Sequence, residues 1–309
     1  MKPTSLKKSE NKADELFEKW LQGIPYEIAF WQSFYGNKGK IAELNLWSKY
    51  NTEADLDEFD MQKFVALHEE TFGFDARIYD VGCALSYMLG NIIGGRDYPI
   101  HYVDVLADFY NELLDKSDTD RPRITFGMTE CLTACIAPSA ADFIHIRNSL
   151  DHCADPVEGI RQALACVRVG GVVYTNHFEN EAKREAYRGF HQYNITERDG
   201  HLVIWGNQGE ICDINEIFAP YADIRAVRTP EGRIVGILTK QKDFADIDDI
   251  LRDTAQRIGR NNMRIVRYFH SAGHDLHYQW IRLYTTFGHR AMRLLPGKWL
   301  RRVKKLLSK

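Results

Sequence analysis

R-I-Y-D-V-G-C-A-L-S, residues 77 to 86, is the stretch of sequence that decides the fold. It begins as a buried strand and continues with small residues at Gly82 and Ala84. We expect the strand to run into a helix, through a turn in which the backbone passes close to a ligand. Asp104 stands 22 positions after Gly82, at the end of the next strand-like run. A carboxylate there can accept hydrogen bonds from both hydroxyls of a ribose, and the alternative is an N-cap for a helix that begins near Leu106.

Short apolar runs alternate with helical stretches from residue 77 onward, which is typical of a parallel sheet with helices on both faces. The clearest helix covers Pro156 to Val167, because proline suits a first turn and apolar residues recur on one face. Farther along, T-P-E-G separates two strand-like runs and predicts an antiparallel hairpin. The predicted strands are 77–81, 100–103, 123–126, 142–146, 171–176, 222–228 and 233–240.

Three segments lie outside this alternating core. Residues 1–75 are predicted to form an N-terminal helical cap, before a core domain at 76–242. An insertion at 179–217 holds aromatic residues and histidines, and we expect it to shape the acceptor side of a substrate pocket. Residues 243–309 are predicted to form a C-terminal helical extension with a basic amphipathic end.

Composition indicates a folded, cytoplasmic protein. Of 309 residues, 44% are hydrophobic and 27% are charged, no apolar run is long enough to span a bilayer, and the six cysteines form no C-x-x-C pair. The net charge is only -3, yet residues 276–309 carry nine Lys or Arg and no acid. This arm predicts peripheral contact with the inner face of an anionic membrane, with packing on a neighbouring subunit as the alternative. Nucleic acid is disfavoured as a partner because the rest of the chain is acidic.

Four ordered segments resemble the successive motifs of class I S-adenosylmethionine-dependent methyltransferases, type 11-like. They are D-V-G-C-A-L-S, V-D-V-L-A-D-F-Y, D-F-I-H-I-R-N-S-L-D-H-C-A-D-P and R-V-G-G-V-V-Y. The resemblance covers about residues 77–240. It implies an α/β fold with a Rossmann-like, seven-stranded, mostly parallel sheet whose last strand is antiparallel, and S-adenosyl-L-methionine as cofactor.

The resemblance also assigns cofactor-binding residues. Asp80, Gly82 and Ala84 would line the methionine side of the cofactor, and Asp104 would bind the ribose. The positions bordering the adenine would be Met128, Thr129 and Glu130, and those near the sulfonium Arg147 and Asn148. This sequence departs from the family at Ala84 and Ser86, where glycines are usual, and at Met128, where an acid is frequent. The departures leave open a catalytically degenerate domain that binds or scaffolds, and a positive φ at Ala84 would cost about 1 kcal/mol or more.

Methylation of a hydroxyl requires a group that removes its proton. The candidates are His152 and His191, followed by Asp151, and His177 stands at the end of the next strand. The alternatives are helix capping and packing at a strand end. His270, His274 and His277 have spacing that could suit a metal, but Gly273 interrupts the run, so no metal site is predicted.

Two outlying segments suggest the acceptor. E-I-A-F-W-Q-S-F-Y-G, from residue 27, and Y-R-G-F-H-Q-Y-N-I, from residue 187, resemble bacterial methyltransferases of surface-polysaccharide biosynthesis. The predicted function is therefore O-methylation of a sugar hydroxyl in a bacterial surface glycan or its precursor. The alternatives are the degenerate scaffold, a methyltransferase of another small molecule or RNA, and, less well matched, a nicotinamide dehydrogenase.

Overall fold

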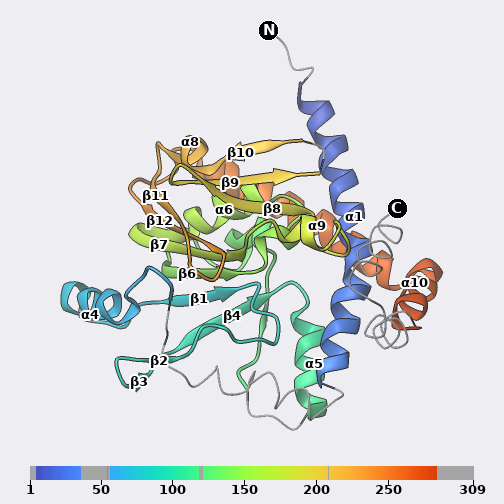
Figure 1. Ribbon diagram of the computed structural model, residues 1–309, viewed down its shortest axis with the longest axis horizontal. Helices are drawn as coiled ribbons and strands as arrows, with labels where there is room; N and C mark the ends of the chain where they lie inside the picture. The colour runs from blue at the N-terminus through green and yellow to red at the C-terminus, as the bar shows by residue number, and fades with distance from the viewer. Residues whose placement is uncertain (1–4, 36–53, 55, 118–120, 208, 284–309) are drawn as a thin grey trace.

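The core of the protein is a seven-stranded sheet, seen in a computed structural model that describes residues 5–35, 54, 56–117, 121–207 and 209–283 (Figure 1). The strand order is β11-β12-β7-β6-β1-β4-β5, and β12 runs antiparallel to both of its neighbours. The fold class predicted from the sequence is thereby confirmed. The strands are β1 Ile78–Val81, β4 Ile100–Asp104, β5 Thr125–Phe126, β6 Ala141–Arg147, β7 Val167–Phe178, β11 Ala222–Arg228 and β12 Arg233–Lys240.

Helices cover both faces of this sheet, which is why its central strands are apolar on both sides. On one face α6, Pro156–Cys166, packs its buried side chains against β1, β6 and β7. Asp155 caps α6 by accepting the Glu158 N–H, and Pro156 occupies the first turn as predicted. On the other face α4, Met61–Phe72, packs against an aromatic cluster from β6 and β7.

The helix predicted to follow the first strand is absent, and this prediction was wrong. Residues 82–91 form successive turns, and a small antiparallel pair follows, β2 Ile92–Ile93 and β3 Arg96–Asp97. Two reasons lie in the residues. Ala84 and Tyr87 have φ of +44° and +45°, which no right-handed helix contains, and the buried side chains of Leu85, Tyr87 and Leu89 recur with a period of two rather than 3.6.

The N-terminal helix α1, Ser5–Tyr35, lies across the carboxyl ends of the strands (Figure 1). Its apolar residues recur at helical spacing and pack against loop residues that follow β1, β4 and β5. The buried side chains of α1 are Phe17, Trp20, Leu21, Ile24, Ile28 and Trp31. The two N-terminal helices thus have different places, because α1 covers the strand ends while α4 lies on a sheet face.

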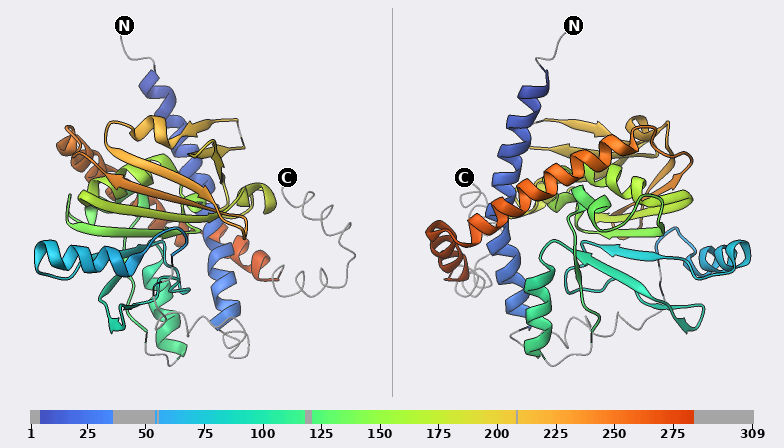
Figure 2. Two further views of the ribbon diagram at one scale, coloured as in Figure 1. Left: turned by 60° about the vertical axis from the view of Figure 1, so that its left-hand side comes forward. Right: turned by 180° about the vertical axis from the view of Figure 1, so that it is seen from behind.

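Two more helices follow the sheet, α9 Ile247–Phe269 and α10 Ala272–Leu283, and α9 crosses α1 (Figure 2). The predicted basic amphipathic end of the chain lies outside the described residues. None of the helices in the described ranges combines the length and apolar character that crossing a bilayer demands. The remaining helices are α5 Ala107–Ser117, η1 Thr129–Ala134, η2 Leu150–His152, α7 Glu181–Arg184 and α8 Ile214–Phe218.

The insertion folds as its own three-stranded antiparallel sheet of β8 Tyr193–Arg198, β9 His201–Gly206 and β10 Ile211–Asp213. The β8–β9 hairpin turns at Asp199 and Gly200, whose φ values of +53° and +83° are those that a two-residue hairpin turn demands. An Asp-Gly pair is a sequence signal for this turn. Ile195, Leu202 and Ile204 then anchor the insertion in the main core.

Candidate active site at the carboxyl ends of the strands

Asp104 ties the loop after β1 to the loop after β4. Its carboxylate accepts the backbone N–H of Ala84 at 2.9 Å through Oδ2 and that of Leu106 at 2.9 Å through Oδ1. Burial raises the pKa of Asp104 to about 7, although both backbone hydrogen bonds oppose the shift. The hydrogen bond from the Leu106 N–H, just before α5, partly confirms the alternative role of Asp104 as an N-cap. Each oxygen keeps a further lone pair with which to accept a hydrogen bond from a ligand.

The loop after β1 holds the other predicted methionine-side residues. Gly82 has φ +67° and donates its N–H to the Val103 carbonyl at 2.8 Å, so the loop leaves β1 alongside β4. At the end of β1, Asp80 Oδ1 is 2.7 Å from His145 Nδ1. Its other oxygen, Oδ2, is buried and has no hydrogen-bond partner within the described ranges. A buried acceptor without a partner indicates that a donor belongs there.

Ala84 is strained, as the sequence analysis anticipated for a positive φ, because its Cβ crowds the backbone at +44°. We expect Ala84→Gly to raise the free energy of unfolding by about 0.5–1 kcal/mol, since relief of the strain outweighs the extra chain entropy of glycine. Urea unfolding of the two proteins measures the difference. A decrease in stability would show instead that the packing of the Ala84 methyl group matters more than its backbone conformation.

The predicted adenine-side residues are held firmly in the structure. Met128 is buried in the apolar cluster that the side chains of α1 form with the loops after β1, β4 and β5. Glu130 is buried, and its Oε1 accepts the N–H groups of Ala154 at 2.7 Å and Asp155 at 3.2 Å. The pKa of Glu130 is raised by this burial. Glu130 therefore fixes the loop between η2 and α6, and Thr129 is buried next to it. Contact of these residues with adenine stays a prediction.

The predicted sulfonium-side residues lie at the end of β6. Asn148 has φ +48°, and its Oδ1 accepts hydrogen bonds from the Phe178 N–H and from Arg233 Nη2. Arg147 is half-buried, and burial lowers its pKa despite the nearby carboxylate of Asp80. Its Nε has no partner among the described residues.

The structure brings together Asp151, His152 and His191, which the sequence offered as separate candidates for the proton-accepting group. Asp151 and His152 lie on η2, and His191 comes from the insertion, where the Gln192 N–H donates to the Asp151 carbonyl at 3.0 Å. Asp151 Oδ2 is 2.7 Å from His191 Nδ1 and 3.6 Å from His152 Nε2, and the two ring nitrogens are 3.2 Å apart. His177, at the end of β7, faces the same carboxylate at 3.9 Å.

Burial and Asp151 act in opposite directions on these histidines. Burial lowers the pKa of His152 more than Asp151 raises it. For His191 burial also lowers the pKa, but the hydrogen bond and charge of Asp151 outweigh burial and raise it to about 9. Burial lowers the pKa of His177 to about 3. Burial alone would raise the pKa of Asp151, but the charges of the histidines hold it well below its usual range.

Two acidic residues of this site were missed by the sequence analysis. Glu181 on α7 is coupled electrostatically to Asp151 and His191, and burial raises its pKa to about 7. Glu27 on α1 interacts with the charges of Asp104, His152 and His191. A signal for Glu27 existed, because it interrupts the apolar stripe of α1 between Ile24 and Ile28. Glu181 gave none.

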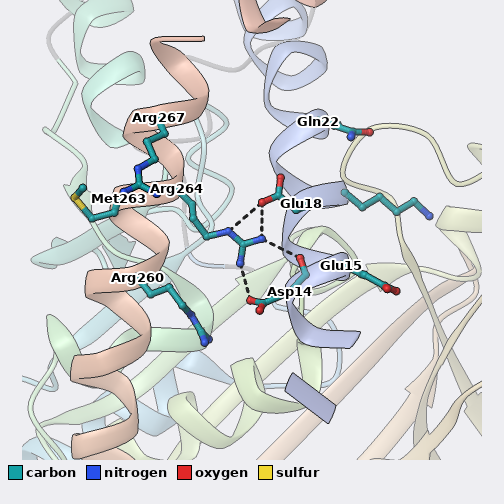
Figure 3. A pocket seen from close by; sticks show the side chains of 9 residues that line it. Asp14, Glu15, Glu18, Gln22, Arg260, Met263, Arg264 and Arg267 are labelled. Atoms are coloured by element: carbon teal, nitrogen blue, oxygen red, sulfur yellow. Dashed lines mark hydrogen bonds and ion pairs between the residues drawn. The ribbon is translucent and has the colours of Figure 1, made fainter. Parts of the chain in front are cut away.

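A groove of about 880 Å³ lies away from this site, between α1 and α9 (Figure 3). Arg264 of α9 crosses it and forms ion pairs with Asp14 at 2.8 Å and Glu18 at 2.7 Å. None of the predicted site residues lines it. We therefore interpret this groove as a charged contact between two helices. A second hollow, of about 200 Å³, is lined by Gln192 and Tyr193, which directly follow His191 in the sequence.

Comparisons with known proteins concern the fold. No protein-family model matches the sequence, and a search of curated proteins finds no match. Among solved structures, a Methanococcus maripaludis protein whose proposed activity is S-adenosyl-L-methionine-dependent methyl transfer is 16% identical, with a TM-score of 0.40, over 69% of this chain and 95% of that one. A SAM-dependent methyltransferase from Aquifex aeolicus is 11% identical, with a TM-score of 0.35, over 64% and 96%. A T. thermophilus 16S rRNA N2 methyltransferase, solved with AdoMet and guanosine, is 12% identical, with a TM-score of 0.35, over 62% of this chain and 41% of that one. Identities this low concern the fold alone, and the order of the strands establishes the Rossmann-like sheet independently.

Proposed function

We propose that the protein is an S-adenosylmethionine-dependent methyltransferase that methylates a hydroxyl group. The observation that carries the proposal is the buried Asp104 carboxylate at the end of β4, bonded to the Ala84 N–H of the loop after β1. In open α/β sheets, ligands bind outside the carboxyl ends of the strands, and both of these loops leave the sheet at that edge. An acid at the end of this strand is suited to the two hydroxyls of a ribose.

The residues present fit such a cofactor. Asp104 retains lone pairs for a ribose, and the unpartnered Asp80 Oδ2 suits a donor such as the amino group of the methionine part. Asp80 and Glu27 add acidic groups that interact with Asp104 at the carboxyl ends of the strands, and negative charge there favours a sulfonium cation. When bound, the cofactor supplies an electrophilic methyl group. The residues proposed to hold it are Asp80, Gly82, Ala84, Asp104, Met128, Thr129, Glu130, Arg147 and Asn148, the last five by resemblance.

A hydroxyl acceptor is proposed because proton-accepting groups stand beside this edge. Asp151, His152 and His191 lie together, Phe190 of the insertion contacts the His152 ring, and the charge of Glu27 on α1 acts on both histidines. Enclosure by these two segments would orient an acceptor and exclude water. The Trp20 ring of α1 stacks on Phe190 of the insertion at 5.2 Å, so the two covering segments contact each other.

A sugar hydroxyl is the acceptor that we propose to test first, on the strength of the two outlying segments. The polar side chains of the insertion do not add support. Asn194 accepts the Lys183 N–H and donates to the Tyr187 hydroxyl, and Gln192 donates to the Gly189 carbonyl, so both hold the insertion together. Peripheral membrane contact of the basic C-terminal segment stays part of the proposal.

Titration calorimetry with S-adenosylhomocysteine between pH 5.5 and 8.5 tests the cofactor. Ribose hydroxyls donate to the ionised form of Asp104, whose pKa in the free protein is about 7. We therefore expect constant affinity above about pH 8 and a loss of up to about tenfold per pH unit below pH 7, because the ionised fraction falls by that factor. NAD serves as the control ligand.

Transfer of labelled methyl groups from S-adenosylmethionine tests the acceptor. We expect label in a carbohydrate extract, with release of S-adenosylhomocysteine. Label in a quinone, amine or RNA instead would contradict the glycan acceptor but keep the proposed methyltransferase activity.

The strained Ala84 and the absence of the helix predicted after β1 favour one competing function, a domain that keeps the fold but no longer catalyses methyl transfer. Folded protein that binds neither S-adenosylmethionine nor S-adenosylhomocysteine would establish that reading.

A further inference from the structure

Asp151, His152 and His191 present three metal-ligand atoms to one point. The distances between Asp151 Oδ2, His152 Nε2 and His191 Nδ1 are 2.7, 3.2 and 3.6 Å. Metal–ligand bonds of about 2.0–2.2 Å place neighbouring ligand atoms about 3.0–3.5 Å apart, so a point about 2.1 Å from all three atoms exists. Among the residues that the structure describes, one group of His, Cys, Asp and Glu side chains is close enough to share an ion, and it consists of these three residues.

Unpartnered polar atoms beside the three provide a second observation. Asp151 Oδ1 and both ring nitrogens of His177 are buried and have no hydrogen-bond partner among the described residues. The side chains of Asp151 and His177 are only 2% and 1% exposed, and Asp151 Oδ1 is 3.9 Å from His177 Nδ1. Buried polar atoms in native proteins are nearly always paired, so these three atoms indicate that the cluster lacks a partner. Asp151 Oδ1 belongs to the carboxylate that would bind the ion, whereas the two His177 nitrogens are not among the three ligand atoms.

The electrostatics of the surroundings favour a cation as that partner. Glu181 and Glu27 add carboxylates whose charges act on His191, besides that of Asp151. Arg184 and Arg233 are the cations that act on the neighbouring Glu181 and His177. Negative groups therefore outnumber positive ones around the three ligand atoms.

We propose that Asp151, His152 and His191 bind a divalent transition-metal ion, with His177 positioned beside the carboxylate. Two imidazoles and one carboxylate suit Zn²⁺, Fe²⁺, Co²⁺ or Ni²⁺ rather than Mg²⁺ or Ca²⁺, which prefer oxygen ligands alone. The sequence predicted no metal site, so this proposal departs from that expectation. An ion with three protein ligands keeps a position open, where a hydroxyl oxygen of an acceptor would bind and become more acidic. Binding of the ion does not depend on the proposed methyl transfer, so it can be tested separately.

Zn²⁺ titration of the full chain, freed of metal with a chelator, tests the site by calorimetry. We expect one ion per chain at this site, and Co²⁺ in its place to give a visible absorption band of nitrogen and oxygen ligation. His152→Gln and His191→Gln change side chains that are 21% and 26% exposed, and each is expected to weaken binding at least about tenfold. Asp151→Asn, which preserves side-chain shape, is the third variant.

His201→Gln is the matched control. His201 forms a similar pair with Asp213 at 2.8 Å on the insertion, but outside the cluster, so we expect its variant to bind Zn²⁺ as the wild type does. Circular dichroism and thermal unfolding without metal show whether each variant is folded. The proposal is overturned if the folded wild type binds no Zn²⁺ or Co²⁺, or if binding survives in both cluster variants, as it would at surface histidines such as His270. Equal loss in the control would overturn it too.

Discussion

Asp104→Asn is expected to weaken the binding of S-adenosylhomocysteine at pH 8 by about 100-fold or more. The carboxylate can accept two charge-assisted hydrogen bonds from a ribose, each worth about 1.5–3 kcal/mol, while an amide offers one neutral acceptor and misplaces an NH₂ group. The residual affinity should no longer depend on pH between 5.5 and 8.5. Calorimetry on both proteins measures the effect.

The stability of this variant separates a binding role from a structural one. A folded pKa of about 7 lies above the unfolded value of 3.8, so between these values the folded protein binds more protons than the unfolded chain. The stability of the wild type therefore falls as pH rises from about 4 to 7, by up to about 4 kcal/mol from this group, and the variant lacks this fall. At pH 8 the removal of a buried charge opposes the loss of one of the two backbone hydrogen bonds, which an amide cannot both accept, so we expect the variant to lie within about 2 kcal/mol of the wild type.

Asp108→Asn is the matched control, since it makes the same chemical change at an exposed position in the first turn of α5. Its affinity and stability should follow those of the wild type. Unchanged binding by a folded Asp104→Asn protein would contradict both the ribose role and the proposed cofactor. Lost binding accompanied by a loss of stability at pH 8 well beyond about 2 kcal/mol would mean that Asp104 acts through the two loops that it ties together.

Helices and strands whose ends are marked by nearby proline or glycine residues could be predicted closely from the sequence. The strands Ala222–Arg228 and Arg233–Lys240 have the predicted bounds, because T-P-E-G permits a reversal and little else. The helix that begins at Pro156 ends one residue before its predicted end. In each case, residues within four positions of the boundary determine it.

Features set by distant contacts could not be read in this way. The loop after β1 contains helix-compatible residues, but Leu85 and Tyr87 are buried in the cluster under α1 and Leu89 in the cluster that α4 covers. Burial in two different clusters forces an extended, turning path. His191 and Asp151 stand far apart in the sequence and could be predicted only as separate candidates. Only the fold shows that they share a hydrogen bond across 40 positions, after the insertion has docked on η2.

Gly82→Ala is expected to lower the free energy of unfolding by about 2–5 kcal/mol. Gly82 has φ +67°, which costs a residue with a Cβ about 1–2 kcal/mol, and a Cβ built there lies 2.3 Å from Ser149 Oγ and 2.4 Å from Ser149 Cβ. The variant should also weaken cofactor binding, because the loop that carries Ala84 must shift. Urea unfolding measures the loss. Gly73→Ala is the control, since Gly73 has φ +76° but nothing within 4 Å of its added Cβ, and it should cost only about 1 kcal/mol.

Ser149→Gly should rescue part of this loss, because the atoms within 4 Å of the added Cβ belong to Ser149 alone. In the double variant only the backbone strain of Ala at position 82 remains, so we expect the two substitutions to couple favourably by about 1–3 kcal/mol. Additive effects would contradict the steric explanation. The altered motif follows the same logic: the glycine kept at position 82 is the one that the approach of Ser149 requires, whereas the structure holds an alanine at position 84 despite its φ of +44°.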